Sequence, residues 1–575
     1  MPKLLLFGNE AIARGAWESG VTVAAGYPGT PSTEILENVA AHYKNEIYCE
    51  WSPNEKVAFE VAAGAALAGA RAMATMKHVG LNVAADPLMT LAYTGVVGGF
   101  ITIVADDPGM HSSQNEQDTR RFAQFAKIPI LEPSDSQEAK DFVRHGIEIS
   151  EQFQIPVILR SVTRISHSRT MVELGDRKET ERPVGFVKDP PKYVAIPAWA
   201  RPMRVRLEQK FQEMRQAASK SPLNRIEWRN KKLGIVTSGV VYQYVREAYP
   251  EASVLKLGWS FPFPDDLIRE FAAGVEKILV VEELEGFLEE HLKTLGIACS
   301  GKDTLPNIGE FSQDILRGRR IEDRGRNIPL PTLPPRPPVL CAGCPHRGIF
   351  YALGKFDVVV SGDIGCYSLG ALPPLSRMDT LLCMGGGVSL AHGMERAKNP
   401  KKVVGIVGDS TFFHSGITGL MDIAYNKGES TIIVVDNRTT AMTGHQDHPG
   451  TGLTLMEEET ITVSIEEVGK AVGVKNTITI DPNDVKETVA VLKAAIESPE
   501  PWLIVSKAPC PLATREPLGP PLAVDCDKCK NCGLCLKLGC PGIEKDADTI
   551  RINPLLCAGC RMCQNLCPTQ AIAEL

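Results

Sequence analysis

Short apolar runs rich in β-branched residues alternate with helical patterns along most of this chain. Clear examples are residues 100–105 (FITIVA), 233–237 (LGIVT) and 277–281 (KILVV). Three further runs lie at residues 358–360, 403–407 and 431–435, with a helical pattern over 418–426. Such runs, bounded by turns and separated by helices, are typical of parallel sheets covered by helices. We therefore predict an α/β fold made of doubly wound domains.

Two proline-rich segments divide this pattern. Residues 328–338 hold six prolines and predict a stiff, extended connector, and the prolines between Pro509 and Pro521 precede a cysteine-rich tail. Residues 176–230 are rich in Arg, Lys, Gln and Pro, and we interpret them as a linker with a solvated or docking helix over 204–216. The predicted divisions are 1–175, 176–230, 231–327, 328–338, 339–512 and 520–575.

Composition narrows the class of protein. The chain has 575 residues, 43% of them hydrophobic, and a formal net charge of −7, which gives no reason to expect a nucleic-acid partner. No apolar stretch reaches the roughly 18 residues that a membrane helix needs. The N-terminus resembles a first strand and turn more than an export signal. With its many thiols, the chain is expected to be cytoplasmic.

Cysteines are concentrated at the end of the chain. Nine of the sixteen fall between Cys526 and Cys567, in two runs that each end in Cys-Pro. The second run, C-x2-C-x2-C-x3-C-P from Cys557 to Pro568, has the spacing that wraps a [4Fe–4S] cluster, with the fourth thiolate crossing to a partner cluster. The first run, from Cys526 to Pro541, holds five cysteines where four are needed. We predict a small α+β, two-cluster tail that carries single electrons.

The thiols can be assigned to two clusters. One takes Cys529, Cys532, Cys535 and Cys567, and the other takes Cys540, Cys557, Cys560 and Cys563. This leaves Cys526 spare, and a register shifted by three residues is the alternative. A pair of zinc sites is the competing interpretation, because C-x2-C pairs also make tetrahedral zinc centres. A disulfide framework is disfavoured in a chain long enough for its own cores.

Two turns that follow strands predict a magnesium diphosphate site. Gly408-Asp409-Ser410 follows the run at 403–407, and Asn437-Arg438-Thr439 follows the run at 431–435. One crossover helix fits between them, so the strands are expected to be parallel neighbours with adjacent carboxyl ends. Asp409, the Asn437 amide and the Thr439 carbonyl would give Mg²⁺ three oxygen ligands. Gly408 would let the backbone approach the phosphates.

These turns resemble those of thiamine diphosphate (ThDP) enzymes, whose motif is GDG followed by Asn-Asn. This chain departs from the motif at Ser410 and Arg438, neither of which removes a metal ligand. The loop from Gly362 through Gly365 to Cys366 resembles the second diphosphate-contacting turn of these enzymes.

The resemblance also implies a carboxylic acid beside N1′ of the aminopyrimidine, supplied by another domain. Residues 54–65 resemble the helix that carries this acid, and Glu55 is the residue that we select. Glu60, five residues after Glu55, is instead expected to be an exposed charged residue on the same helix. The alternative for Glu55 is a purely electrostatic cap of its helix.

Further segments resemble the 2-oxoacid:ferredoxin oxidoreductases. Residues 27–32 resemble a YPxTPSS loop, which implies that Thr30 binds the 2-oxoacid carboxylate, with Arg120 or Arg121 as a second partner or as a surface ion pair. Residues 340–347 resemble a CxGCPHR segment, in which His346 approaches the cofactor. No second cysteine pair lies nearby in sequence, so we do not predict a metal site there. Residues 440–450 are expected to line the substrate pocket.

The whole chain resembles the α-subunit family of the indolepyruvate:ferredoxin oxidoreductases. The implied domains are a pyrimidine-binding domain (1–175), a transketolase C-terminal-like domain (231–327), a diphosphate- and Mg-binding domain (339–512) and a ferredoxin-like tail (520–575). The implied cofactors are ThDP, Mg²⁺ and two [4Fe–4S] clusters.

The implied reaction is oxidative decarboxylation of arylpyruvates with coenzyme A to arylacetyl-CoA and CO2, with ferredoxin as electron acceptor. A small β subunit is expected, in a heterotetramer of two α and two β chains. One alternative is a non-redox decarboxylase that releases an aldehyde. Another is the same chemistry on an arylglyoxylate or a branched-chain 2-oxoacid.

Overall fold

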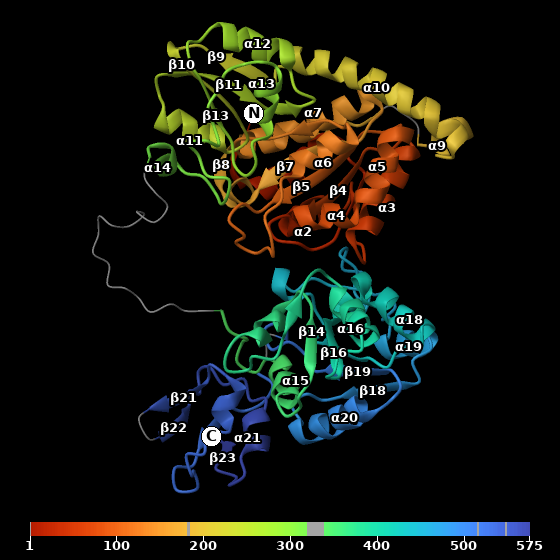
Figure 1. Ribbon diagram of the computed structural model, residues 1–575, viewed down its shortest axis with the longest axis vertical. Coiled ribbons are helices and arrows are strands. Elements are labelled where there is room, and N and C mark those ends of the chain that lie inside the picture. Colours follow the sequence, from red (N-terminus) through yellow and green to blue (C-terminus); the bar gives the residue numbers. More distant parts are fainter. Residues whose placement is uncertain (1, 181–183, 319–337, 515–516, 547–548) are drawn as a thin grey trace. The chain divides into compact units, whose positions relative to one another are not determined.

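The computed structural model describes residues 2–180, 184–318, 338–514, 517–546 and 549–575. The chain forms two compact units, Met1–Thr332 and Leu333–Leu575, and each is described by itself (Figure 1). The predicted proline-rich connector, apart from residue 338, lies outside the described residues. Within the described part of the chain, no helix is long and apolar enough to cross a membrane.

The first unit is built around a seven-stranded sheet in the order β12-β6-β7-β5-β4-β2-β3. All its neighbouring strands are parallel except β12 and β6. The strands are β2 (Val23–Gly26), β3 (Tyr48–Trp51), β4 (Ala72–Lys77), β5 (Phe100–Asp106), β6 (Ile130–Leu131), β7 (Val157–Val162) and β12 (Trp259–Phe261). The predicted strand at 100–105 is confirmed as β5, whose residues are all buried.

Short helices surround this sheet, and a two-stranded antiparallel ribbon holds the N-terminus. The helices are α1 (Gly8–Glu18), α2 (Thr33–Tyr43), α3 (Glu55–Leu67), α4 (His78–Val83), α5 (Ala85–Thr94), α6 (Thr119–Ala126), α7 (Ser136–Phe153) and α8 (Thr163–His167). The ribbon pairs β1 (Lys3–Phe7) with β8 (Arg169–Glu173). The N-terminal segment therefore begins the fold as a strand, as predicted.

A four-stranded sheet, in the order β13-β10-β11-β9, completes the first unit. Its elements are β9 (Asn224–Glu227), β10 (Asn230–Ser238), α11 (Val241–Ala248), β11 (Ala252–Leu257), α12 (Asp265–Ala273), β13 (Ile278–Val281), α13 (Phe287–Thr294) and α14 (Gln313–Leu316). β12 follows β11 in sequence but pairs with β6 of the seven-stranded sheet. That sheet therefore contains strands from before and after the predicted linker.

The charged helix of the predicted linker is longer than expected. After the short α9 (Pro190–Tyr193), α10 (Pro197–Lys220) extends from α5 to α12 (Figure 1). It buries Met203, Leu207, Met214 and Ala218. This narrow apolar stripe packs the helix against the unit, and charged residues beside the stripe, such as Lys210 and Arg215, contact neighbouring segments.

The second unit contains a six-stranded parallel sheet in the order β15-β14-β16-β17-β19-β18. The strands are β14 (Val359–Gly362), β15 (Thr380–Leu381), β16 (Val403–Gly408), β17 (Thr431–Asp436), β18 (Asn476–Ile480) and β19 (Trp502–Lys507). The helices are α15 (His346–Leu353), α16 (Gly386–Arg396), α17 (Asp409–Thr411), α18 (Ile417–Tyr425), α19 (Ile465–Ala471) and α20 (Val485–Glu497). The three predicted strands and the predicted crossover helix are confirmed.

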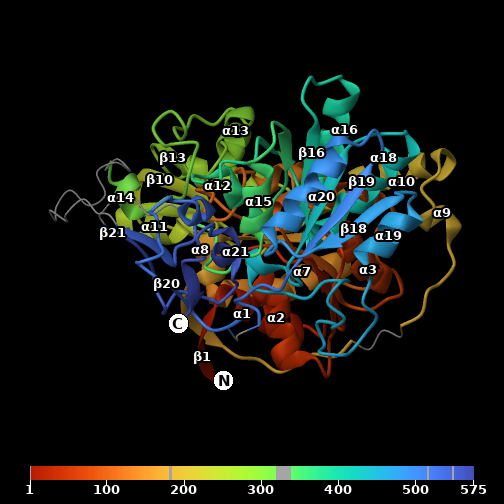
Figure 2. The same ribbon diagram turned by 90° about the horizontal axis from the view of Figure 1, so that it is seen from below.

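This sheet is apolar on both faces. Ile433 and Val435 of β17 pack with α15 and α20 in one core, whereas Ile432 and Val434 pack with α16 and α18 in the other. In both ribbon views α20 lies against β18 and β19 (Figures 1 and 2). Burial on both faces explains why these strands have continuous rather than alternating apolar sequences.

The tail is a small α+β structure that packs on the same unit. It pairs β20 (Leu522–Val524) with β23 (Ile572–Glu574) and β21 (Ile543–Asp546) with β22 (Thr549–Ile552), and it contains α21 (Met562–Leu566). Its core includes Tyr351 of α15 and Val485 of α20. The predicted fold class, α/β domains followed by a small α+β tail, is confirmed.

Candidate active site

The carboxyl ends of β16 and β17 lie side by side, as predicted. Gly408 pairs with Val435 in parallel register, so the two turns that follow the strands are neighbours. Asp409, Ser410, Asn437 and Thr439 are all buried. A Cβ at Gly408 would lie 2.7 Å from the Tyr367 ring, so this glycine leaves room for Tyr367 rather than only for a ligand.

Two buried oxygens of these turns lack a protein hydrogen bond. Asp409 Oδ2 and Asn437 Oδ1 have no hydrogen-bond partner among the described residues, whereas Asp409 Oδ1 accepts from the Ser410 N–H at 2.8 Å. Buried acceptors are normally satisfied. Asp409 Oδ2 has only an ion-pair contact, with His448 Nε2 at 3.2 Å, and together with the Asn437 oxygen it suits a hard divalent cation such as Mg²⁺.

Charges around Asp409 keep its carboxylate ionised. Burial raises the Asp409 pKa, but His448, the Ser410 N–H and Asp436 together bring it below its usual value. His448 Nε2 lies 3.2 Å from Asp409 Oδ2, and its Nδ1 accepts from the Gly450 N–H at 3.1 Å. Burial and the nearby Asp409 raise the pKa of Asp436 to about 6. The sequence placed residues 440–450 near the pocket but gave no signal for His448 itself.

His346 begins α15 and is buried within electrostatic reach of Asp409. Burial lowers its pKa to about 4, so the imidazole is neutral near pH 7. Its ring lies edge-on to that of Tyr367, with centroids 6.0 Å apart.

The loop after β14 contacts the Asp409 turn. Tyr367 donates to the Ile364 carbonyl at 3.0 Å, and the Thr411 hydroxyl lies 3.4 Å from the same oxygen. Asp363 is fully buried and accepts from the Gly387 N–H at 3.0 Å in the first turn of α16. Burial raises its pKa to about 7. The loop that carries Gly365 and Cys366 is therefore tied to the predicted diphosphate turn.

Four cysteines from three segments lie close enough to interact electrostatically. They are Cys341, Cys344, Cys510 and, in this loop itself, Cys366. Burial raises the pKa of Cys344 to about 12, and the thiols of Cys366 and Cys341 add to the effect. Burial likewise raises the pKa of Cys366 to about 11, with contributions from Cys341 and Cys510. The sequence predicts no metal site at the C-x2-C pair, and it gave no sign of Cys366 and Cys510 near that pair, because both are distant from it in sequence.

The tail cysteines also form two groups. The thiols of Cys529 and Cys532 lie close enough to Cys535 to raise its pKa, and those of Cys540, Cys557 and Cys560 do the same for Cys563. Cys535 of the first group also acts on Cys563, so the two groups are adjacent. The Leu522 N–H donates to Cys557 Sγ and the Ala571 N–H donates to Cys567 Sγ. Cys526 is exposed. In the described residues no three His, Cys, Asp or Glu side chains converge on one metal ion. A [4Fe–4S] cluster does not need such convergence, since each thiolate binds a different iron.

Glu55 is buried at the first position of α3. The Asn54 side chain caps this helix by accepting from the Val57 N–H at 2.9 Å. A Cβ at Gly80 would lie 2.7 Å from Glu55 Oε1, so glycine leaves space for the carboxyl group. Glu60 is exposed and pairs with Lys56, as expected for a surface charge.

A buried lysine lies beside Thr30. Lys77 ends β4, and its Nζ donates to the Ser112 carbonyl at 3.1 Å, while the Ser112 hydroxyl donates to the Thr30 carbonyl at 3.2 Å. Burial lowers the pKa of Lys77 to about 8, against the attraction of Asp107 and Glu55. Lys77 sits in an ordinary strand pattern, so no local signal distinguishes it in the sequence.

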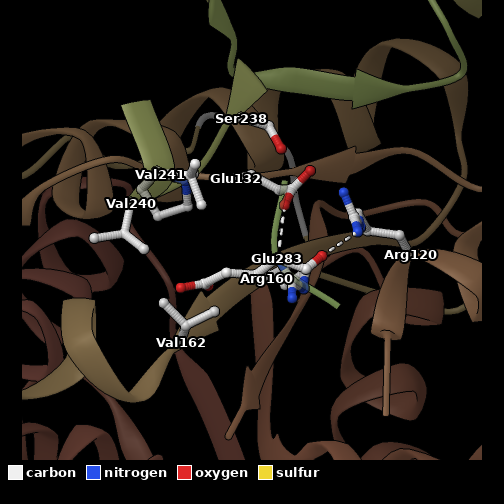
Figure 3. Close-up of a pocket in the computed structure, with 10 residues that line it drawn as sticks. Arg120, Glu132, Arg160, Val162, Ser238, Val240, Val241 and Glu283 are labelled. Carbon is white, nitrogen blue, oxygen red and sulfur yellow. Dashed lines mark hydrogen bonds and ion pairs between the residues drawn. The ribbon is translucent and has the colours of Figure 1, made fainter. Parts of the chain in front are cut away.

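Arg120 lies in a different environment from the one predicted. It is 1% exposed, and its guanidinium donates to Asp118 at 2.8 Å and to Glu282 at 2.7 Å. Figure 3 shows Arg120 and Arg160 with Glu132 and Glu283 around a cavity of about 10 Å³. Two carboxylates already neutralise Arg120, which disfavours its predicted contact with a substrate carboxylate. Arg121 is more exposed and pairs with Glu290 at 2.8 Å.

Known proteins resemble the chain over its length. Residues 14–221 match the family model described as "Pyruvate flavodoxin/ferredoxin oxidoreductase, thiamine diP-bdg". Residues 363–506 match "Thiamine pyrophosphate enzyme, C-terminal TPP binding domain". A solved 2-oxoglutarate:ferredoxin oxidoreductase from Magnetococcus marinus shares 18% identity at a TM-score of 0.46, over 56% of this chain and 65% of that chain.

Two curated relatives are much more similar. The indolepyruvate oxidoreductase subunit IorA of Methanothermobacter thermautotrophicus is 44% identical over 99% of this chain and 97% of its own length. The IorA subunit of Pyrococcus horikoshii is 42% identical over 100% of this chain and 97% of its own. The two family models indicate a ThDP-dependent enzyme that decarboxylates 2-oxoacids oxidatively. Identity of this extent shows that the chain belongs to the family of indolepyruvate ferredoxin oxidoreductase α subunits.

Proposed function

We propose that the chain oxidatively decarboxylates arylpyruvates of the indolepyruvate type. The bond between the carboxylate and the carbonyl carbon breaks, CO2 leaves, and a thioester forms with coenzyme A. One proton is released, and two electrons pass singly to two oxidised ferredoxins. The observation that carries this proposal is the buried pair of Asp409 and Asn437 oxygens, neither of which accepts a hydrogen bond from the described residues, in the same unit as the cysteine groups.

The cofactor supplies the carbanion chemistry that cleaves a 2-oxoacid. Asp409, Asn437 and the Thr439 carbonyl would hold Mg²⁺, and the loop with Gly365 and Cys366, together with Gly408 and Ser410, would enclose the diphosphate. Glu55 would hold a proton at N1′ of the aminopyrimidine. His346, neutral near pH 7, would present an uncharged imidazole near the Asp409 turn.

Thr30 and Lys77 would bind the substrate carboxylate, with Lys77 in the role first predicted for Arg120.

Lys77→Met is expected to raise KM about 10–100-fold, because a hydrogen bond to a charged group contributes about 1.5–3 kcal/mol. Steady-state kinetics with an arylpyruvate measure the effect, and Lys77→Arg should recover part of it. The exposed Lys56→Met is the matched control. An unchanged KM in Lys77→Met would refute this assignment.

The tail thiols would hold two [4Fe–4S] clusters, with Cys529, Cys532, Cys535 and Cys567 on one and Cys540, Cys557, Cys560 and Cys563 on the other. Clusters of this kind accept electrons one at a time.

The thiols of Cys341, Cys344, Cys366 and Cys510 form a further set of the same composition, beside Asp409. We propose that they hold a third cluster, between the diphosphate turn and the tail.

Iron content tests the third cluster. Anaerobically purified protein is expected to hold about twelve irons per chain, against about eight if only the tail binds clusters. Cys344→Ser should remove about four. Cys49→Ser, at a buried cysteine of the other unit, should change nothing. About eight irons in both the native chain and Cys344→Ser would contradict this assignment.

The product distinguishes the proposed reaction from simple decarboxylation. The chain, with the small partner subunit that its family implies, is expected to form arylacetyl-CoA only when coenzyme A and ferredoxin are both present. Product analysis after mixing with indolepyruvate measures this. Undiminished turnover to an aldehyde without an electron acceptor would refute the redox proposal. A screen of arylglyoxylates and branched-chain 2-oxoacids tests the substrate class.

A further inference from the structure

Arg347 joins the diphosphate domain to the tail through backbone carbonyls. It is the second residue of α15, and only 3% of it is exposed. Its guanidinium donates to the Leu538 carbonyl at 2.9 Å and to the Gly539 carbonyl at 2.7 Å, immediately before Cys540. It also donates to the carbonyls of Leu340 and Cys341, the latter at 3.2 Å. One side chain therefore fixes both segments that lead into proposed cluster ligands.

No carboxylate of the described residues is paired with this buried charge, since all of its hydrogen-bond acceptors are backbone carbonyls. Burial lowers the Arg347 pKa, and the groups that oppose this effect are the thiols of Cys540, Cys344, Cys341 and Cys560. A buried cation without an anion is costly. The nearby groups that could balance the charge of Arg347 are these sulfurs, once they bind metal as thiolates.

Other buried arginines of the chain have ordinary partners. Arg120 pairs with Asp118 and Glu282, and Arg160 pairs with Asp106 and Glu132. Arg347 differs in that cysteines replace the acidic residues around it. Two of these cysteines belong to a proposed tail cluster and two belong to the proposed third cluster. The thiolates of bound clusters would supply the missing negative charge.

We propose that Arg347 is a positioning residue that holds the tail on α15 and whose charge favours the reduced state of the adjacent clusters. This inference rests on the proposed function, because it requires clusters on these thiols. Each reduction adds one electron, drawn from oxidation of the 2-oxoacid, and so one negative charge. A fixed cation nearby stabilises the added charge and raises the reduction potential.

Potentiometric titration followed by electron paramagnetic resonance tests the inference on the anaerobic enzyme complex. Arg347→Gln should shift at least one cluster to a more negative midpoint. The expected shift is about a tenfold change in the ratio of reduced to oxidised cluster at fixed potential, or about 59 mV. Arg347→Lys, which keeps the charge, should stay close to the native midpoint. Arg377→Gln, at an exposed arginine of the same unit, should not change it.

The outcomes separate this inference from the proposed function. Native clusters with an unshifted midpoint in Arg347→Gln would overturn the inference and leave the proposed function standing. Absence of any cluster signal in the native complex would overturn both. If Arg347→Gln loses its iron, the iron content of Arg347→Lys tests the inference instead. Iron retained in the lysine variant would support the role of the charge, and iron lost from both variants would overturn the inference.

Discussion

Replacing Glu55 by glutamine is expected to lower kcat by about 10²–10⁴-fold, the usual contribution of a positioned acid or base. Glutamine has nearly the same shape, and Gly80 leaves room for either side chain. An amide, however, cannot exchange a proton with N1′ of the aminopyrimidine. Affinity for ThDP should therefore change little while turnover falls. Steady-state kinetics at saturating arylpyruvate, with calorimetric titration of ThDP, separate the two effects.

The matched control is Glu60→Gln, on the same helix. Glu60 is exposed and pairs only with Lys56 among the described residues, so its loss should leave kcat unchanged. If Glu55→Gln kept more than a tenth of native kcat, or if Glu60→Gln lost as much, Glu55 would not be the acid. Glu55 would then only cap α3.

Removing the Asp409 carboxylate should abolish Mg²⁺-dependent binding of ThDP. Loss of a residue that only supports a metal ligand lowers affinity by up to about 100-fold. Loss of Asp409, a direct ligand, is therefore expected to lower the affinity for ThDP by more than that. The cofactor-free protein should lose little stability, because repulsion between Asp409 and the buried Asp436 offsets part of the contact of Asp409 with His448 at 3.2 Å. Calorimetric titration of Asp409→Ala with ThDP at several Mg²⁺ concentrations, together with thermal unfolding, measures both quantities.

Asp422→Ala is the control for this change. Asp422 lies on α18 of the same unit and is largely exposed, so the variant should bind ThDP as the native chain does. If Asp409→Ala bound ThDP with native affinity in the presence of Mg²⁺, Asp409 would not be a metal ligand. A large loss of stability in the cofactor-free variant would show that Asp409 is a structural residue.

The parts of the fold that the sequence revealed are those set by local pattern. Residues 403–407 and 431–435 are apolar on both faces and end in turns, so strands, parallel pairing and the position of Asp409 and Asn437 all followed. α10 was harder to predict, because its four buried residues are spread among many charged ones. The pairing of β12 with β6 depends on tertiary contact and left no local signal.

A site residue was predictable where the segment that carries it has a recognisable pattern of its own. Glu55 lies in a recognisable helix, whereas Arg120 looked available until its partners Asp118 and Glu282 were known. Glu282 is distant in sequence, so no pattern near Arg120 reveals the pairing. Lys77, Cys510 and Arg347 acquire their surroundings from segments far along the chain. Each is a common residue in an unremarkable local sequence.

The central claim is that electrons released by decarboxylation enter iron–sulfur clusters held by this chain. The most direct measurement is electron paramagnetic resonance of the anaerobic complex, frozen after mixing with indolepyruvate and coenzyme A without ferredoxin. The account predicts signals of reduced [4Fe–4S] clusters that appear together with CO2 and disappear when ferredoxin is added. Release of CO2 and a free aldehyde with no reduced cluster, or a tail that contains zinc, would contradict it.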